Sequence, residues 1–332
     1  MLLARKRYAF RHGWDNAMKK ALIIFGVVIG SIILLPLAHL AVWALIPPLS
    51  PHKLAKTGHF ISVGSIDTYY ERYGSGPPLI LIPPGGSHTS AWRFNIGTLS
   101  RSHEVWTFDL PGSGYTDKPA TFPYTHRSYA QFLRDFMTIM GIHKSVIGGQ
   151  SLGGTVALEF ALDFPERTAG LVLIDSGGYS RGVKLGAFNP LRYPLTNAIL
   201  MSFSSYPAIV KSFFAYIYYD PAPFARDTAL VKQACDINRT PNARDAFYWM
   251  QHGLDFDFAI PDVSRIKSVA VPTLIVWGRE DRIVDVRTAA RFHQDIAGSQ
   301  LVVIDDAGHM VHEEKPDAVD HAITSFLDTI RW

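Results

Sequence analysis

The stretch Gly149-Gln150-Ser151-Leu152-Gly153 places a serine between two glycines, and its neighbours show what kind of turn it forms. Residues 145–148 form a short apolar run that predicts a buried strand, and residues 152–164 carry apolar and small residues at helical spacing. A serine between such a strand and helix lies on a sharp, strained turn, where the two glycines relieve crowding and leave its Oγ exposed. A bare Gly-x-Ser-x-Gly match is often an ordinary turn, but this context favours a nucleophile.

A serine hydroxyl needs a base to remove its proton, and the base needs a carboxylate to orient it. Two later segments offer such groups. Residues 273–277 predict a buried strand followed by Gly278-Arg279-Glu280-Asp281, and residues 301–304 predict another followed by Asp305-Asp306-Ala307-Gly308-His309. Ligands bind at the carboxyl edge of parallel sheets, so we expect both groups to lie at that edge with Ser151.

These segments resemble the α/β-hydrolase family, in its lid-bearing branch of esterases, lipases and carbon–carbon bond hydrolases. The matching stretches are Asp109-Leu110-Pro111-Gly112-Ser113-Gly114, the turn around Ser151, Trp277-Gly278-Arg279-Glu280-Asp281 and Asp306-Ala307-Gly308-His309. The resemblance covers roughly residues 60–332. It implies Ser151 as nucleophile, His309 as general base and Asp281 as orienting acid. Serine in place of aspartate at the turn speaks against epoxide hydrolases and haloalkane dehalogenases.

Other residues compete for two of these roles. The alternatives to Asp281 as the acid are Asp175, Glu280 and Asp285. Asp175 follows the predicted strand over residues 171–174, a position that some family members use for the acid. His312 lies three residues beyond His309, but the family pattern places the base directly after Ala-Gly.

Acyl transfer develops negative charge on a carbonyl oxygen, which two backbone N–H groups should meet in an oxyanion hole. One donor is expected from Leu152, directly after the serine, and the other from the loop that follows a predicted strand over residues 79–82. The family commonly has His-Gly where this chain has Pro83-Pro84. Proline has no N–H, so we expect Gly85 to be the second donor, with Gly86 as the alternative.

The strand pattern predicts an α/β fold with a mostly parallel, eight-stranded sheet flanked by helices, one of them over residues 128–140. Residues 60–64 and 66–73 predict an antiparallel hairpin. The six further strands are expected to begin near Leu79, Glu104, Ser145, Gly170, Thr273 and Gln300. The alternation of strands and helices is interrupted over residues 177–262. This aromatic-rich stretch predicts a helical lid between two parts of the hydrolase core, residues 59–176 and 263–332.

The N-terminus carries a separate signal. Residues 21–46 are almost wholly apolar and would span about 39 Å as a helix, enough to cross a hydrocarbon core of about 30 Å. A cleavable signal peptide has a shorter apolar region of about 7–15 residues, so we expect an uncleaved transmembrane anchor, joined to the core by a linker over residues 47–58.

Charge predicts the orientation of this anchor. Residues 1–20 hold six basic residues against one acid, Asp15, a net charge of about +5, and form a basic tail. The positive-inside rule keeps such a tail cytoplasmic and exports the catalytic domain to the periplasmic, extracellular or lumenal side. Because the whole chain carries only +3, the remainder is slightly acidic, and nothing predicts a nucleic-acid partner.

The sequence predicts no cofactor and no metal: the lone cysteine, Cys235, belongs to no zinc-like spacing, and no glycine loop ends in the Lys-Ser/Thr that binds phosphate. The expected protein is a membrane-anchored serine hydrolase that cleaves an ester or similar acyl bond of a small hydrophobic substrate. An acyltransferase or a carbon–carbon bond hydrolase could use the same triad. A non-catalytic binding module on the membrane surface is the alternative outside enzymes. The sequence does not predict the oligomeric state.

Overall fold

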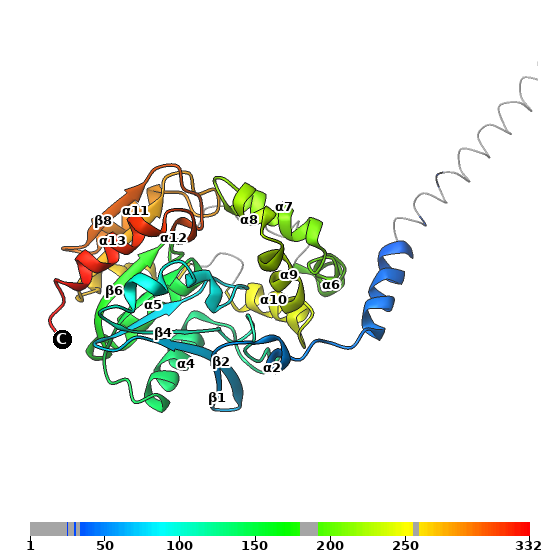
Figure 1. Ribbon diagram of the computed structural model, residues 1–332, viewed down its shortest axis with the longest axis horizontal. Helices are drawn as coiled ribbons and strands as arrows, with labels where there is room; N and C mark the ends of the chain where they lie inside the picture. The colour runs from blue at the N-terminus through cyan, green and yellow to red at the C-terminus, as the bar shows by residue number, and fades with distance from the viewer. Residues whose placement is uncertain (1–24, 26–29, 31–33, 180–191, 255–258) are drawn as a thin grey trace, which may run out of the picture. The chain divides into compact units, whose positions relative to one another are not determined.

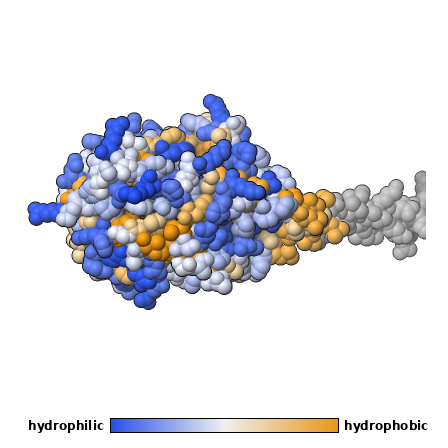
Figure 2. Space-filling model, turned by 60° about the horizontal axis from the view of Figure 1, so that its bottom comes forward, coloured by the Kyte–Doolittle hydropathy of each residue, from blue (hydrophilic) through white to orange (hydrophobic). Residues whose placement is uncertain are grey.

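The computed structural model describes residues 34–179, 192–254 and 259–332, together with Phe25 and Gly30 (Figure 1). The chain divides into two compact units, residues 1–47 and 48–332. In the first unit a helix covers Leu34–Leu45, and Leu34, Leu35 and Leu45 are 65%, 68% and 84% exposed. This helix is coloured as hydrophobic beside the grey atoms in Figure 2.

No single helix of the described residues is both long and apolar enough to cross a membrane. The predicted anchor over residues 21–46 lies in large part outside the described residues, as does the basic tail over residues 1–20. The transmembrane helix therefore stays a prediction.

The second unit is built on one eight-stranded sheet, in the order β1-β2-β4-β3-β5-β6-β7-β8. Its strands are β1 (His59–Val63), β2 (Ile66–Tyr73), β3 (Pro78–Ile82), β4 (Glu104–Phe108), β5 (Ser145–Gln150), β6 (Thr168–Ile174), β7 (Thr273–Gly278) and β8 (Gln300–Ile304). Strand β2 pairs antiparallel with β1 and β4, and the other neighbouring pairs are parallel. The predicted eight-stranded, mostly parallel sheet is confirmed.

Helices cover both faces of this sheet, and the strands alternate between two hydrophobic cores. Ile80 and Ile82 face the core that holds α4 (His126–Ile139), α5 (Leu152–Asp163) and α11 (Arg287–Asp295). Leu79 and Leu81 face the other core, built with η1 (Thr89–Trp92), α3 (Ile96–Leu99), α12 (Val311–Glu314) and α13 (Pro316–Leu327). The sheet is therefore buried on both sides, as a parallel sheet requires.

Helix α4 begins two residues before the predicted position. Thr125 and Ser128 form a reciprocal capping box, in which the Thr125 side chain accepts from the Ser128 N–H and the Ser128 side chain accepts from the Thr125 N–H. This cap satisfies backbone donors that the first turn leaves unpaired.

Among the described residues, five α-helices lie within the range predicted for the lid, between β6 and β7 in the chain (Figure 1). They are α6 (Pro194–Ser202), α7 (Pro207–Ile217), α8 (Ala222–Arg226), α9 (Thr228–Ile237) and α10 (Ala243–Gly253). Shorter elements elsewhere in the unit include α2 (Pro51–Leu54), η2 (Pro165–Arg167) and η5 (Val263–Ser268). Helices α7 to α9 form a small core of their own, which also includes Met310, the residue after His309.

Candidate active site

Ser151 lies on the single-residue turn between β5 and α5. Its backbone has φ 54° and ψ −118°, a conformation that a residue with a side chain adopts only under strain. A Cβ atom on Gly149 would lie 2.2 Å from the Gly153 carbonyl, and one on Gly153 would lie 2.3 Å from the Ile82 carbonyl oxygen. Both glycines are therefore needed for this turn to form, as the sequence predicted.

His309 and Asp281 meet beyond the ends of β8 and β7. His309 Nδ1 lies 2.8 Å from Asp281 Oδ2, and both side chains are buried. A carboxylate only accepts, so Nδ1 donates this hydrogen bond and Nε2 is left as an acceptor. Asp281 is fixed in turn, because its Oδ1 accepts from the N–H groups of Ile283 and Val284 at 2.7 and 2.9 Å.

Asp175, the alternative acid, lies in the same cluster but makes different contacts. Its nearest ligand-type atom lies within 4.8 Å of those of Asp281 and His309. Its two oxygens accept from the N–H groups of Gly278 at 2.8 Å and Val311 at 3.2 Å, whereas the His309 ring bonds to Asp281. Complete burial, and next the charge of Asp281, raise the pKa of Asp175 well above its usual range. Through these two backbone bonds, Asp175 joins the loop that carries Asp281 to the segment after His309.

His312 occupies a separate place from His309. Its ring is fully buried against Trp92, with the ring centres 4.5 Å apart, on the α12 side of the sheet. Burial lowers the pKa of His312 to about 3, with the nearby charge of Arg93 as a smaller cause. A neutral histidine packed in this way fills the core, and the hydrogen bond to Asp281 belongs to His309.

The two expected oxyanion donors lie next to each other. A Cβ atom on Gly85 would lie 2.8 Å from Leu152 Cδ2, so the Gly85 backbone packs directly on Leu152. Leu152 is the first residue of α5, where a helix leaves its N–H groups without an intrahelical partner. The alternative, Gly86, donates its N–H to Ser113 Oγ at 3.0 Å. This bond occupies the Gly86 N–H, so Gly85 remains the expected donor beside Leu152.

Asp109 supports the loop that carries these donors. Its carboxyl accepts from the N–H groups of Thr89 and Tyr115, both at 2.7 Å. A Cβ atom on Gly114 would lie 2.0 Å from Asp109 Oδ2, so this turn also requires glycine. Burial raises the pKa of Asp109 to about 7, although both backbone bonds lower it. Asp109 therefore builds this turn.

Three further residues shape the site, and sequence reasoning missed all of them. The side-chain amide of Gln150, next to the serine, donates to the His309 carbonyl oxygen. Glu314 accepts from the N–H groups of Gly308 and Tyr219, both at 2.6 Å, and so ties the histidine loop to the lid. Met250 of α10 brings its sulfur to 3.2 Å from a Cβ position on Gly85. Only Gln150 lies inside a recognised motif, so it alone carried a signal that could have pointed to it.

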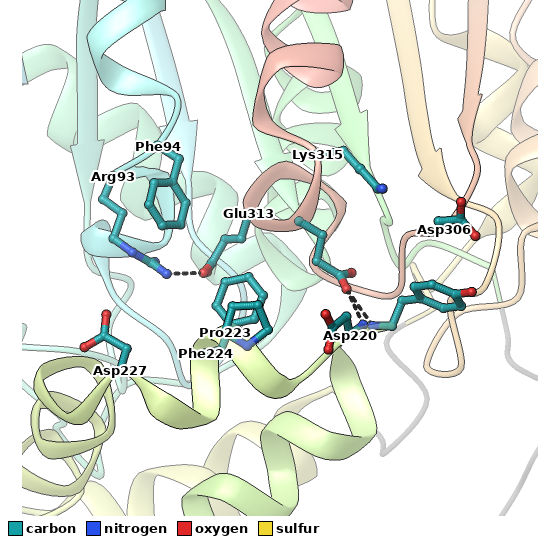
Figure 3. A pocket seen from close by; sticks show the side chains of 11 residues that line it. Arg93, Phe94, Asp220, Pro223, Phe224, Asp227, Asp306, Glu313 and Lys315 are labelled. Carbon is teal, nitrogen blue, oxygen red and sulfur yellow. Dashed lines mark hydrogen bonds and ion pairs between the residues drawn. The ribbon is translucent and has the colours of Figure 1, made fainter.

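A cavity of about 640 Å³ opens between the lid and the segment after His309 (Figure 3), and Ser151 is not among its lining residues. Its lining includes five carboxylates, but most of them have a structural partner. Glu313 pairs with Arg93 at 2.6 Å, Glu314 binds backbone N–H groups, and Asp227 caps α9. We therefore do not assign this cavity as the place of the chemistry.

Asp175, Asp281 and His309 have the spacing that could hold a metal ion. His309 Nδ1 and Asp281 Oδ2 are, however, already joined by a hydrogen bond, and the Asp175 oxygens accept from backbone N–H groups. The atoms that could bind a metal ion here are therefore already hydrogen-bonded within the protein.

Comparison with known proteins agrees with this geometry. The alpha/beta hydrolase fold family matches residues 77–316, so the chain belongs to this family and the predicted family is confirmed. It is 25% identical over 270 residues to the uncharacterized hydrolase YugF of Bacillus subtilis, a match that covers 80% of this chain and 96% of that protein.

Two relatives have a named reaction. The 2-hydroxy-6-oxo-6-(2'-aminophenyl)hexa-2,4-dienoic acid hydrolase of Metapseudomonas resinovorans is 30% identical over 278 residues, 81% of this chain and 90% of that protein. The solved meta-cleavage product hydrolase of Pseudomonas fluorescens IP01, a serine-to-alanine mutant complexed with acetates, superposes with a TM-score of 0.71 at 27% identity. That match covers 82% of this chain and 97% of the other.

Proposed function

We propose that this α/β hydrolase is a serine hydrolase in which Ser151 is the nucleophile, His309 the general base and Asp281 the acid that orients it. The observation that carries the proposal is the buried 2.8 Å bond from His309 Nδ1 to Asp281 Oδ2, which leaves Nε2 able to take a proton. Ser151 lies at the end of β5, on the same edge of the sheet as the ends of β7 and β8.

The proposed reaction follows from these positions. Ser151 Oγ attacks the substrate carbonyl while His309 Nε2 takes the hydroxyl proton, and Asp281 stabilises the resulting imidazolium. The negative charge on the carbonyl oxygen is met by the N–H groups of Leu152 and Gly85. The imidazolium then protonates the leaving group, and water releases the acyl group from Ser151.

The favoured substrate has an ester or similar acyl bond and an apolar body. Support comes from lid helix α10, because Met250 packs against Gly85 and belongs to the buried apolar cluster that includes Leu152 and Tyr124. Apolar walls with few polar groups are typical of small-molecule sites. Carbon–carbon bond cleavage is the second candidate, favoured by the reactions for which two relatives are named.

We further propose that the protein is anchored in a membrane through residues 21–46, with its N-terminus in the cytoplasm and the hydrolase domain on the other side. The apolar run and the basic tail support this topology. The strongly exposed leucines of the Leu34–Leu45 helix are consistent with lipid contact.

Active-site labelling tests the catalytic assignment. A fluorophosphonate probe should label the wild-type protein and the surface control Ser102→Ala, but not Ser151→Ala. Labelling that persists in Ser151→Ala would show that another residue is the nucleophile. A panel of acyl esters of increasing chain length and a 2-hydroxy-6-oxo-dienoate, measured side by side, then separates the two substrate classes by kcat/KM.

A further inference from the structure

Lid helix α7 is apolar on two adjacent faces. Its inner face, Val210, Phe214 and Ile217, is only 5–7% exposed and packs in the core of the lid. Its outer face, Ile209, Phe213 and Tyr216, is 46%, 59% and 54% exposed. Both sets recur at helical spacing of four and three residues, so each forms a continuous stripe. Packing within the fold accounts only for the inner stripe, so the outer stripe is left to meet a further apolar partner or lipid.

Further exposed apolar side chains lie on helix α6 and at the residues that flank it. Tyr193 precedes α6, Leu195 and Leu200 lie on it, and Tyr206 precedes α7. These side chains are 49%, 57%, 45% and 41% exposed, in that order. We call these four residues and the outer face of α7 the lid face. Helices α6 and α7 meet at 103°, and together they are long and apolar enough for a bent membrane span. Single exposed apolar residues are normal, but an apolar patch of this kind marks an interaction site.

The charged residues of this part of the lid indicate what kind of partner it would bind. The chain has no acidic residue from Arg192 to Tyr219, and its two charged residues in that range, Arg192 and Lys211, are basic. Helices that lie at a bilayer surface combine aromatic and aliphatic residues with basic ones, because lipid headgroups are often anionic. The lid face has this combination.

The point at which the chain enters the domain lies beside the lid. The Leu49 N–H donates to the Arg239 carbonyl oxygen at 2.9 Å, directly after helix α9. The neighbouring Asn238 Nδ2 donates to the Ser204 carbonyl oxygen at 2.8 Å, in the turn between α6 and α7. Through Arg239 and Asn238, the first residues of the domain are therefore linked to the turn between α6 and α7. The residues that precede them are the apolar run over 21–46.

We propose that the lid face docks on a lipid bilayer with anionic headgroups, its apolar side chains entering the interface and Lys211 lying at the headgroups. This inference rests on the proposed membrane anchoring for the identity of the partner, but its test is independent of catalysis and of the anchor. The same helix reaches the candidate active site, because the Ile217 carbonyl oxygen accepts from the His309 N–H at 2.8 Å. Docking of the lid face would therefore also hold the end of α7 against the loop that carries His309.

The test uses residues 48–332, which form a compact unit. The match to YugF covers 96% of that relative, so YugF consists of little more than this unit. The protein carries Ser151→Ala, so that binding is measured without turnover. Co-sedimentation with phosphatidylcholine–phosphatidylglycerol vesicles gives the partition coefficient. Ile209→Glu and Phe213→Glu are compared with Ile139→Glu on α4, because Ile139 and Ile209 are both 46% exposed.

We expect the parent protein and Ile139→Glu to bind equally, and Ile209→Glu and Phe213→Glu to bind about tenfold or more weakly, as loss of one buried apolar side chain implies. Unchanged thermal unfolding of each variant shows that the fold is retained. Equal binding by all variants, or no binding by the parent, would overturn the proposal. A dimer in light scattering that Phe213→Glu dissociates would also overturn it, because the lid face would then be an interface between two copies.

Discussion

His309 donates a 2.8 Å hydrogen bond to Asp281, which lies 28 residues earlier in the chain and in another loop. The bond forms because β7 and β8 are parallel neighbours, so that the loops after them meet at one edge of the sheet. It fixes both the orientation and the tautomer of the imidazole, which is what a general base at Ser151 requires.

The first prediction concerns the choice of acid. Asp281→Asn should lower kcat by up to about 10⁴-fold, because an amide facing Nδ1 favours the wrong tautomer. Asp175→Asn should lower kcat far less, since Asp175 binds backbone N–H groups whereas the His309 ring bonds to Asp281. Kinetics of both variants on one ester substrate, with thermal unfolding as a folding control, measure the difference. A collapse of activity in Asp175→Asn alone would reassign the acid.

Part of this site could be predicted from sequence because its signals are local. The run into Ser151, the glycines beside it and the strand ends before Asp281 and His309 are all contiguous stretches with a clear pattern. The six strands β3 to β8 were predicted for the same reason, since buried parallel strands are short apolar runs between turn residues.

The contacts that tie the lid to the core could not be predicted in this way. Glu314 accepts from Tyr219, 95 residues earlier, and Met250 of the lid reaches Gly85 of the core. Neither pairing leaves a periodic or motif-like trace, because each depends on how the lid helices pack on the finished sheet. The raised pKa of Asp175 likewise arises only when folding buries this carboxyl beside Asp281.

The second prediction tests the close packing of the serine turn. Gly153→Ala should prevent folding or abolish activity, because its Cβ would lie 2.3 Å from the Ile82 carbonyl oxygen, which belongs to the sheet and cannot move aside. The matched control is Gly97→Ala in α3, where the Cβ meets nothing within 4 Å. Alanine there should be neutral or stabilise the helix by up to about 1 kcal/mol. Thermal and urea unfolding compare the two; a Gly153→Ala protein as stable and active as Gly97→Ala would refute the assigned turn geometry.

The third prediction is a pH dependence of stability that originates at Asp109. Burial raises the pKa of this carboxyl to about 7 in the folded protein, so the folded state binds its proton more tightly than the unfolded state does. The stability that this proton contributes is therefore lost as pH rises from about 4 to about 7.

Asp109→Asn removes this titration while keeping an oxygen acceptor for one of the two backbone N–H groups. We expect the free energy of unfolding of wild type minus that of Asp109→Asn to decrease from pH 5 to pH 8, measured by urea unfolding at constant ionic strength. A difference that stays constant or grows over this range would contradict the raised pKa.

The last prediction concerns the membrane anchor over residues 21–46. The apolar run is longer than that of a typical signal peptide, and its basic flank lies on the N-terminal side. Carbonate washing should leave the full chain in the membrane pellet, because a spanning helix is not released by loss of surface charge. Residues 48–332 should be released by the same wash and remain active, even though the lid face binds lipid. Protease added to intact cells or spheroplasts should digest the hydrolase domain. Protection of the domain until lysis would show the reverse orientation, and a mature N-terminus near Ala44 would show cleavage and secretion.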